Sequence, residues 1–418
     1  MGHRRALEDY DIIWHILQLF GPHTERDLVD ANSNSWADVG IAVDKDWATL
    51  ACCARVSKAF SEPALRTLWR ELPSPLPLFS LCLTLTRDVF DMPESKRPMI
   101  VWKSNEAPRP QGLRRFARFA ALVQRIRIRH RESFDSNVFA LLFQANPGHP
   151  LLPMIKEIKC RPLVSPFFDT NVLCLAGESL RSLAIYEDTR SGSKEANTHE
   201  PHALRRILLE LPSKAPWLQD LRIYDQACRR VHDLSLAIDI GRFHELRTLV
   251  VGAVPLEELW FGPLMAMLAP LQHLCELDLP LGQWAEDIPS AVGCFPQLRK
   301  LRLHGHVRCR GMQCLGPLAK MAPIRLECLE VADAVVDSFT GDYGAFGDFA
   351  AACAGTLTEV TLSLGETLGG LDPTSASNLL RPFVQLRHLQ LCNICLSGPD
   401  SLSFTDDDLR GIRGRGRS

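Results

Sequence analysis

Three arginines at alternate positions, Arg125, Arg127 and Arg129, are the strongest chemical signal in this chain. Alternate residues of a strand lie on one face, so these side chains would line one surface and could hold a carboxylate or phosphate with paired hydrogen bonds. We expect them to bind an acidic or phosphorylated protein segment; the alternative is that they only keep an exposed sheet soluble. Equivalent positions later in the chain are occupied by Lys159, Tyr186, Arg222, Tyr224, Lys300, Arg302 and His304.

The residue types that carry catalysis do not form a recognisable constellation. Cys392 and Cys395 make one Cys-x-x-Cys pair, but a zinc site needs a second pair, and a redox pair needs a helix amino terminus after a strand. The thirteen histidines include no HExxH, and the glycines of LGETLGG lack the lysine of a phosphate loop. The sequence therefore predicts no enzyme activity, no metal site and no cofactor.

Short repeated strands are the elements that must position these side chains. A six-residue pattern, apolar at positions one, four and six, recurs ten times at steps of 24 to 38 residues, mostly within or just above the period of leucine-rich repeats. One unit cannot bury its own apolar face, so the copies must stack into a solenoid whose concave sheet carries positions three and five. The copies begin at Val123, Ile155, Leu180, Leu218, Leu246, Leu274, Leu298, Leu326, Leu357 and Leu386.

The segments between the hexads predict an α/β fold. Apolar stretches at 203–211, 264–274 and 346–354 have helical spacing and should cover the convex side of the solenoid. A polar insertion at 187–200 explains the longest step between hexads. No further hexad follows the tenth, so we expect the solenoid, residues 113–418, to end in an incomplete repeat.

The residues before the solenoid predict a helical module and a linker. Apolar residues at 7–20 and 47–60 have helical spacing, and Pro63 should open a third helix, because proline is tolerated in a first turn. These three helices would make up residues 1–72. Residues 73–112 contain seven prolines and predict a semi-rigid linker with one short helix near 78–83.

The segment TLACCARVSKAFSEPALRTLWREL, residues 49–72, resembles the F-box, as found at the start of fungal F-box proteins with leucine-rich repeats. The resemblance implies that the module binds a Skp-type adaptor, and through it a cullin, in an SCF-type ubiquitin ligase, while the repeats bind a protein substrate. Trp69 is the expected anchor, since tryptophan is favoured at binding hot spots. The resemblance places these residues on or just behind the adaptor-facing surface: Leu7, Ile12, Ile16, Leu50, Val56, Phe60, Pro63, Leu65 and Trp69.

A different interpretation is a non-ligase interaction scaffold, whose three helices only cap the first repeat. Composition fits either one. The net charge of −2 implies neither nucleic acid nor membrane as a partner, and no apolar run is long enough to span a bilayer. Fourteen cysteines without metal-ligand spacing suit a reducing compartment, so we expect the cytoplasm or the nucleus.

Overall fold

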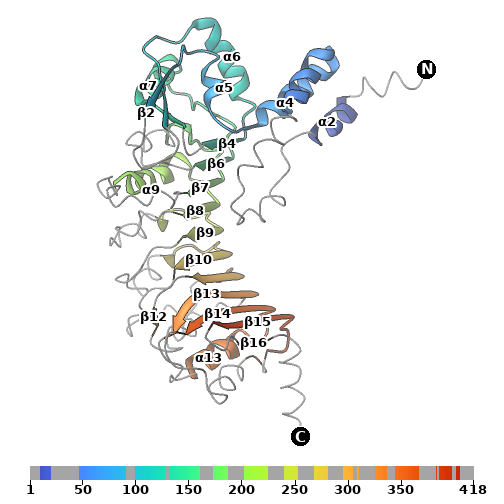
Figure 1. The fold of residues 1–418 in the computed structure, drawn as a ribbon, viewed down its shortest axis with the longest axis vertical. Helices are drawn as coiled ribbons and strands as arrows, with labels where there is room; N and C mark the ends of the chain where they lie inside the picture. The colour runs from blue at the N-terminus through green and yellow to red at the C-terminus, as the bar shows by residue number, and fades with distance from the viewer. Residues whose placement is uncertain are drawn as a thin grey trace, which may run out of the picture. The chain divides into compact units, whose positions relative to one another are not determined.

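The computed structural model of the chain alternates short strands with helices and turns (Figure 1). Contacts between residues divide the chain into a first unit, residues 1–160 with 170–180, and a second unit, residues 161–169 with 181–418. The residues that the structure describes are 10–19, 47–90, 99–128, 132–160, 173–186, 202–224, 240–252, 268–280, 295–304, 308–309, 325–336, 344–366, 383, 386–397 and 402–404.

Three helices open the described part of the first unit: α2 (Tyr10–Gln18), a helix over residues 47–56, and α4 (Lys58–Arg70). Ser57 separates the last two, because its backbone is extended and its hydroxyl accepts a hydrogen bond from the amide of Phe60, as a helix cap does. Our expectation that a helix begins at Pro63 is wrong, since this proline lies inside α4. The serine cap decides the boundary.

These helices, which we call the helical module (residues 10–70), share a small hydrophobic core of their own. Ile13 and Leu17, one turn apart on α2, pack with Leu50 and Ala64, and each of the four is at most 1% exposed. Half-buried side chains surround this cluster: Trp47, Cys53, Ala54, Ala59, Phe60 and Leu68. The module therefore does not depend on the repeats for its core.

The carboxyl end of α4 continues without a loop into the sheet of the first unit. β1 (Glu71–Leu72) pairs in parallel with β4 (Arg125–Ile128), and β4 pairs in parallel with β6 (Glu157–Cys160). The amide of Gln124 donates to the carbonyl of Arg70 at 2.8 Å. The last turn of α4 is thus bonded directly to the first repeat strand.

The described residues of the proline-rich segment, 73–90 and 99–112, form packed structure where we expected a linker. Its prolines begin two helices, one at each end of the segment, because proline suits a first helical turn. Two antiparallel strands lie between these helices, and a third strand extends their sheet in parallel. These elements are α5 (Leu76–Phe79), β2 (Thr86–Phe90), β3 (Met99–Lys103), α6 (Pro110–Ala120) and β5 (Glu132–Phe134).

Phe79 of α5 is at the centre of the aromatic core of the first unit. Its ring meets those of Phe134 and Phe139 edge-on, at centroid distances of 5.2 and 5.5 Å, and lies 6.4 Å from that of Phe116. Phe139 belongs to α7 (Ser136–Ala145). Because all four rings are at most 3% exposed, the segment expected to be a linker supplies a main part of this core.

In the second unit, successive repeats contribute adjacent strands to one sheet. The pairs are parallel, as leucine-rich repeats require, except that the last strand, β16, returns antiparallel to β15. In order, the strands are β7 (Ser182–Tyr186), β8 (Asp220–Tyr224), β9 (Thr248–Val251), β10 (Glu276–Pro280), β11 (Lys300–His304), β13 (Cys328–Val336), β14 (Glu359–Glu366), β15 (Leu391–Ser397) and β16 (Leu402–Phe404), with β12 (Arg308–Cys309) beside β13.

The hexads predict these strands closely. In the nine copies from Val123 to Leu357, every strand begins at position three, and the side chains at positions one and four are at most 1% exposed. Two of the expected helices are also present, as α9 (His202–Lys214) and α13 (Gly344–Ala352). Of the third, 264–274, the structure describes 268–274, and after Leu268 these residues form turns where we expected helix. The parallel sheets and their buried apolar positions are those of a leucine-rich-repeat solenoid.

The tenth hexad is shifted by three residues from its expected register. Leu391 pairs with Glu359, the position-three residue of β14, so the true hexad is LQLCNI at 389–394. Leu391, expected as a core residue, is 49% exposed, whereas Cys392 and Ile394 are buried.

None of the described helices is long and apolar enough to cross a membrane.

Candidate interaction surfaces

One side of α2 presents large apolar side chains that are exposed in the structure. Ile12 and Ile16 are each 43% exposed and Leu19, just after the helix, is 72% exposed. Their spacing of four and three residues puts them on one face. Val56, at the end of the helix over residues 47–56, is 72% exposed as well. We call these four residues the apolar face; exposed apolar side chains grouped on one helix face, as Ile12, Ile16 and Leu19 are, mark binding sites.

The residues that the resemblance placed at an adaptor surface divide into two groups, with Leu7 outside the described residues. Three are exposed: Ile12, Ile16 and Val56. The others are buried or half-buried: Leu50, Phe60, Pro63, Leu65 and Trp69. Leu19 was missed, although it continues the helical spacing of Ile12 and Ile16.

Trp69, the expected anchor, is engaged within the chain. Its ring stacks on that of Phe119 in α6, with centroids 4.5 Å apart and planes 18° from parallel. Offset stacking of this kind contributes about 1 kcal/mol beyond area burial. Trp69 therefore holds α4 against α6, and a partner that used it would have to displace Phe119.

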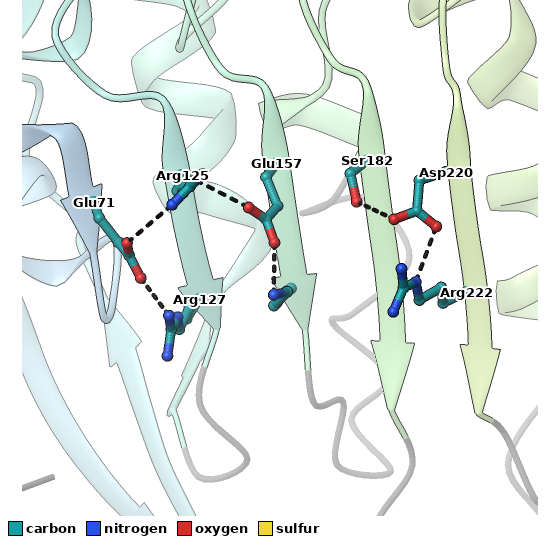
Figure 2. A network of polar contacts seen from close by, with 8 residues as sticks. Glu71, Arg125, Arg127, Glu157, Ser182, Asp220 and Arg222 are labelled. Carbon is teal, nitrogen blue, oxygen red and sulfur yellow. Dashed lines mark hydrogen bonds and ion pairs between the residues drawn. The ribbon is translucent and has the colours of Figure 1, made fainter. Parts of the chain in front are cut away.

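Arg125 and Arg127 pair with carboxylates of the first unit (Figure 2). Arg125 lies 3.8 Å from the carboxylate of Glu71 and 3.1 Å from that of Glu157. Arg127 pairs with Glu71, and Lys159 lies 2.7 Å from Glu157. Two carboxylates thus serve three cations, which does not favour an acidic segment at this place. Arg129 lies outside the described residues.

In the second unit, Asp220 organises the polar contacts on β7 and β8 (Figure 2). It accepts hydrogen bonds from the Ser182 hydroxyl at 3.1 Å and from Nε of Arg222 at 3.0 Å. Tyr224 pairs in register with Tyr186. A Cβ added to Gly252 would lie 3.1 Å from the ring of Tyr224. Gly252 thus leaves the room that the tyrosine ring occupies.

The predicted surface residues of β11 are also paired, each with a carboxylate on a neighbouring strand. Nδ1 of His304 lies 2.8 Å from Asp278, and Nζ of Lys300 lies 3.6 Å from Glu276. Arg302 pairs with Glu330 on β13.

Arg302 lies among three carboxylates, those of Glu330, Asp278 and Glu276. Burial alone lowers its pKa, but the hydrogen bond that Arg302 donates to Glu330 and the nearby carboxylates of Asp278 and Glu276 outweigh that effect and raise its pKa. Each described cation of the predicted surface thus pairs with a carboxylate, although two carboxylates serve three cations on β4 and β6. Recognition on this face would therefore depend on shape and hydrogen bonding more than on net charge.

The Cys-x-x-Cys pair does not form a dithiol site. Cys392 and Cys395 lie three residues apart on β15, so their side chains point to opposite faces of the strand. Cys392 is 3% exposed, the core position that the sequence indicates. Among the described residues, no three or more His, Cys, Asp or Glu side chains are grouped so as to hold a metal ion.

Comparisons with known proteins add little beyond the fold. No protein-family model matches the chain, and no curated protein matches it. Among solved structures, it is similar to an internalin of Listeria monocytogenes, with 14% identity and a TM-score of 0.34 over 66% of this chain and 68% of that one. At that TM-score the likeness supports no conclusion about function.

Proposed function

We propose that this chain is the substrate-recognition subunit of an SCF-type cullin-RING ubiquitin ligase. The helical module, whose sequence resembles the F-box, binds a Skp-type adaptor, and the repeats bind the protein to be ubiquitinated. The observation that carries this proposal is the apolar face, defined by Ile12, Ile16, Leu19 and Val56. The chain supplies recognition and no catalysis of its own.

The energetics of the apolar face fit a binding role. Burying an exposed aliphatic side chain completely stabilises a complex by about 1.5–3 kcal/mol. Ile12 and Ile16 are already partly covered, whereas Leu19 and Val56 are mostly exposed, so covering all four contributes about 5 kcal/mol. Since association itself costs several kcal/mol, the apolar face would be one part of a larger interface with the adaptor.

The separate core of the helical module supports the same function. Ile13, Leu17, Leu50 and Ala64 form this core without the residues of the apolar face, of which Leu19 and Val56 are mostly exposed. A helical piece that only covers the first repeat would direct its apolar side chains toward that repeat. The free cysteines of the described residues suit a reducing compartment, so we place the protein in the cytoplasm or nucleus.

A second candidate, the non-ligase scaffold with a helical cap, rests on α4. This helix continues into β1, and Trp69 stacks on Phe119 of α6, as expected of a helix that covers the end of the array. The two functions differ in what binds the apolar face. In a cap nothing binds it, whereas in a ligase subunit the adaptor covers it.

Co-expression with a Skp-type adaptor and affinity purification test the proposal. The informative variant is Ile12→Asp with Ile16→Asp, since both side chains are exposed and their loss spares the module core. The matched control is Val89→Asp with Leu209→Asp, which places the same two charges on exposed apolar sites elsewhere. We expect the parent and the control to retain stoichiometric adaptor and the α2 variant to lose at least about tenfold in affinity. If the parent captures none, the scaffold function holds instead. If all three capture the adaptor equally, the apolar face is not the adaptor site and the observation that carries the proposal is lost.

A further inference from the structure

Helices α4 and α6 together carry a concentrated positive charge. Between them they hold six cationic side chains and one anionic side chain, a net charge of +5 in a chain whose overall net charge is −2. α6 has no acidic residue at all. We define the basic surface by its cations: Lys58, Arg66, Arg70, Arg114, Arg115 and Arg118.

The two helices lie against each other, and Glu62 brings Arg66 of α4 and Arg118 of α6 together. Trp69 of α4 stacks on Phe119 of α6, and Glu62 pairs with Arg66 at 3.0 Å and with Arg118 at 3.6 Å. Glu62, the one acid on these helices, is therefore shared between two arginines. The side chains of Arg66 and Arg118 are still 50% and 64% exposed, so they remain accessible to a partner.

Helix stability does not explain this arrangement. Arg66 and Arg70, and likewise Arg114 and Arg118, are like charges four residues apart, each pair costing about 0.2–0.5 kcal/mol. The helix dipole favours cations only in the last turn, which accounts for Arg70 and Arg118 but not for Arg114 and Arg115. A charge pattern that weakens the free protein is expected where an anionic partner offsets the cost.

We propose that the basic surface docks an acidic segment of a protein partner. Arginine forks pair with carboxylates through two hydrogen bonds, and five of the six cations are arginines. Neither helix has a large exposed apolar side chain to insert into a lipid bilayer. Trp69 and Phe119 stack on each other, which leaves them unsuited to stacking with bases. An acidic protein segment thus fits better than a membrane or RNA.

The basic surface is distinct from the apolar face but adjoins it. α2, which carries Ile12 and Ile16, packs on α4 through Ile13, Leu17 and Ala64 of the module core. The proposal nevertheless stands without the ligase function, because it rests on α4 and α6 alone. Its test therefore uses a different ligand from the adaptor.

The test measures binding of a short fluorescein-labelled peptide of glutamate, aspartate and serine to the full chain by fluorescence anisotropy. The test variant is Arg114→Glu, Arg115→Glu, Arg118→Glu, and the control is Arg247→Glu, Arg299→Glu, Arg325→Glu. All six arginines are exposed, and both variants change the net charge equally. We expect Kd to rise at least about tenfold in the test variant and about twofold or less in the control. Added salt should weaken binding by the parent chain.

Two results would overturn the proposal. One is an equal loss in both variants, which would mean that the peptide senses only overall charge. The other is tighter binding of a poly-uridine RNA, or of phosphatidylserine vesicles, than of the acidic peptide. If the glutamate variant fails to fold by circular dichroism, Arg114→Gln with Arg115→Gln replaces it and should still raise Kd several-fold. Adaptor capture by the same variants, measured in parallel, separates this surface from the apolar face.

Discussion

The carboxylate of Glu71 pairs with the guanidinium of Arg127, so the residue that ends α4 is bonded to the strand of the first repeat (Figure 2). Glu71 is 5% exposed and also lies 3.8 Å from Arg125. Strand pairing of β1 with β4 brings these three side chains together. The orientation of α4 relative to the first repeat is therefore fixed by covalent continuity, backbone hydrogen bonds and a buried charge.

Replacing Glu71 with glutamine should destabilise the first unit by about 2 kcal/mol, because two arginines lose the carboxylate that neutralises them. Solvent offsets part of that cost, since Arg125 and Arg127 are 33% and 26% exposed. Urea unfolding followed by circular dichroism measures it. Glu327→Gln is the control, as its pair with Arg299 is exposed and should change stability by less than about 0.5 kcal/mol. Equal effects of the two variants would contradict the role assigned to Glu71.

Gly112 is required by a close approach between α6 and the chain after α5. A Cβ at this position would lie 2.4 Å from the carbonyl oxygen of Leu81 and 2.6 Å from Cα of Cys82. Alanine in a helix is normally more stable than glycine by about 1 kcal/mol, but here the backbone must move. We expect Gly112→Ala to lower the free energy of unfolding by about 1–3 kcal/mol.

Gly347 in α13 gives the matched comparison for Gly112. Nothing lies within 4 Å of its added Cβ, so Gly347→Ala should raise the stability by up to about 1 kcal/mol. Thermal unfolding of the two variants beside the parent chain shows the sign of each effect. A stabilising Gly112→Ala would show that α6 does not approach residues 81–82 as closely as the structure has it.

The shifted tenth hexad makes a prediction that separates two registers. Ile394 is fully buried, so Ile394→Ala should cost about 2–4 kcal/mol, whereas Leu391→Ala, at a side chain 49% exposed, should cost less than about 1 kcal/mol. The register first read from the sequence makes Leu391 a core residue and predicts a large effect there. Urea midpoints of the two variants decide between the registers.

The sequence could not settle that register because LRHLQLCNI fits the hexad pattern twice, from Leu386 and from Leu389. Leu386 and Ile394 are both fully buried, so apolarity alone favours neither. Strand pairing with β14 makes the choice. The nine earlier copies were predictable because each fits the hexad pattern in only one register, and burying the apolar positions of that register requires the repeats to stack.

The parts that sequence analysis missed depend on contacts between distant segments. Glu71 belongs to a two-residue strand that has no repeat pattern of its own, so its pairing with Arg125 and Arg127 had no local signal. Prolines at 73–112 are compatible with an extended linker and with helix starts, and only the burial of Phe79 distinguishes them. For the same reason, the engagement of Trp69 by Phe119 was not foreseen.

Buried thiols should make the stability fall at alkaline pH. Burial raises the pKa of Cys82 and of Cys353 to about 11, above the ordinary value of 9.0. Above about pH 9 the unfolded chain loses these protons while the folded chain keeps them, so rising pH favours unfolding. Their contribution to stability is complete below pH 9 and is lost as the pH approaches about 11.

A Cys82→Ala, Cys353→Ala variant tests this directly. Other groups titrate in the same pH range, and because the parent and the variant share them, their contribution cancels in the comparison. We expect its urea midpoint to decline less steeply with pH than that of the parent. In the folded parent at neutral pH, iodoacetamide should modify the exposed Cys52 and spare Cys82 and Cys353, since a thiol that keeps its proton is a poor nucleophile. Parallel pH slopes, or alkylation of the buried thiols as fast as that of Cys52, would show that these side chains are open to water and that the cores around them are not closed.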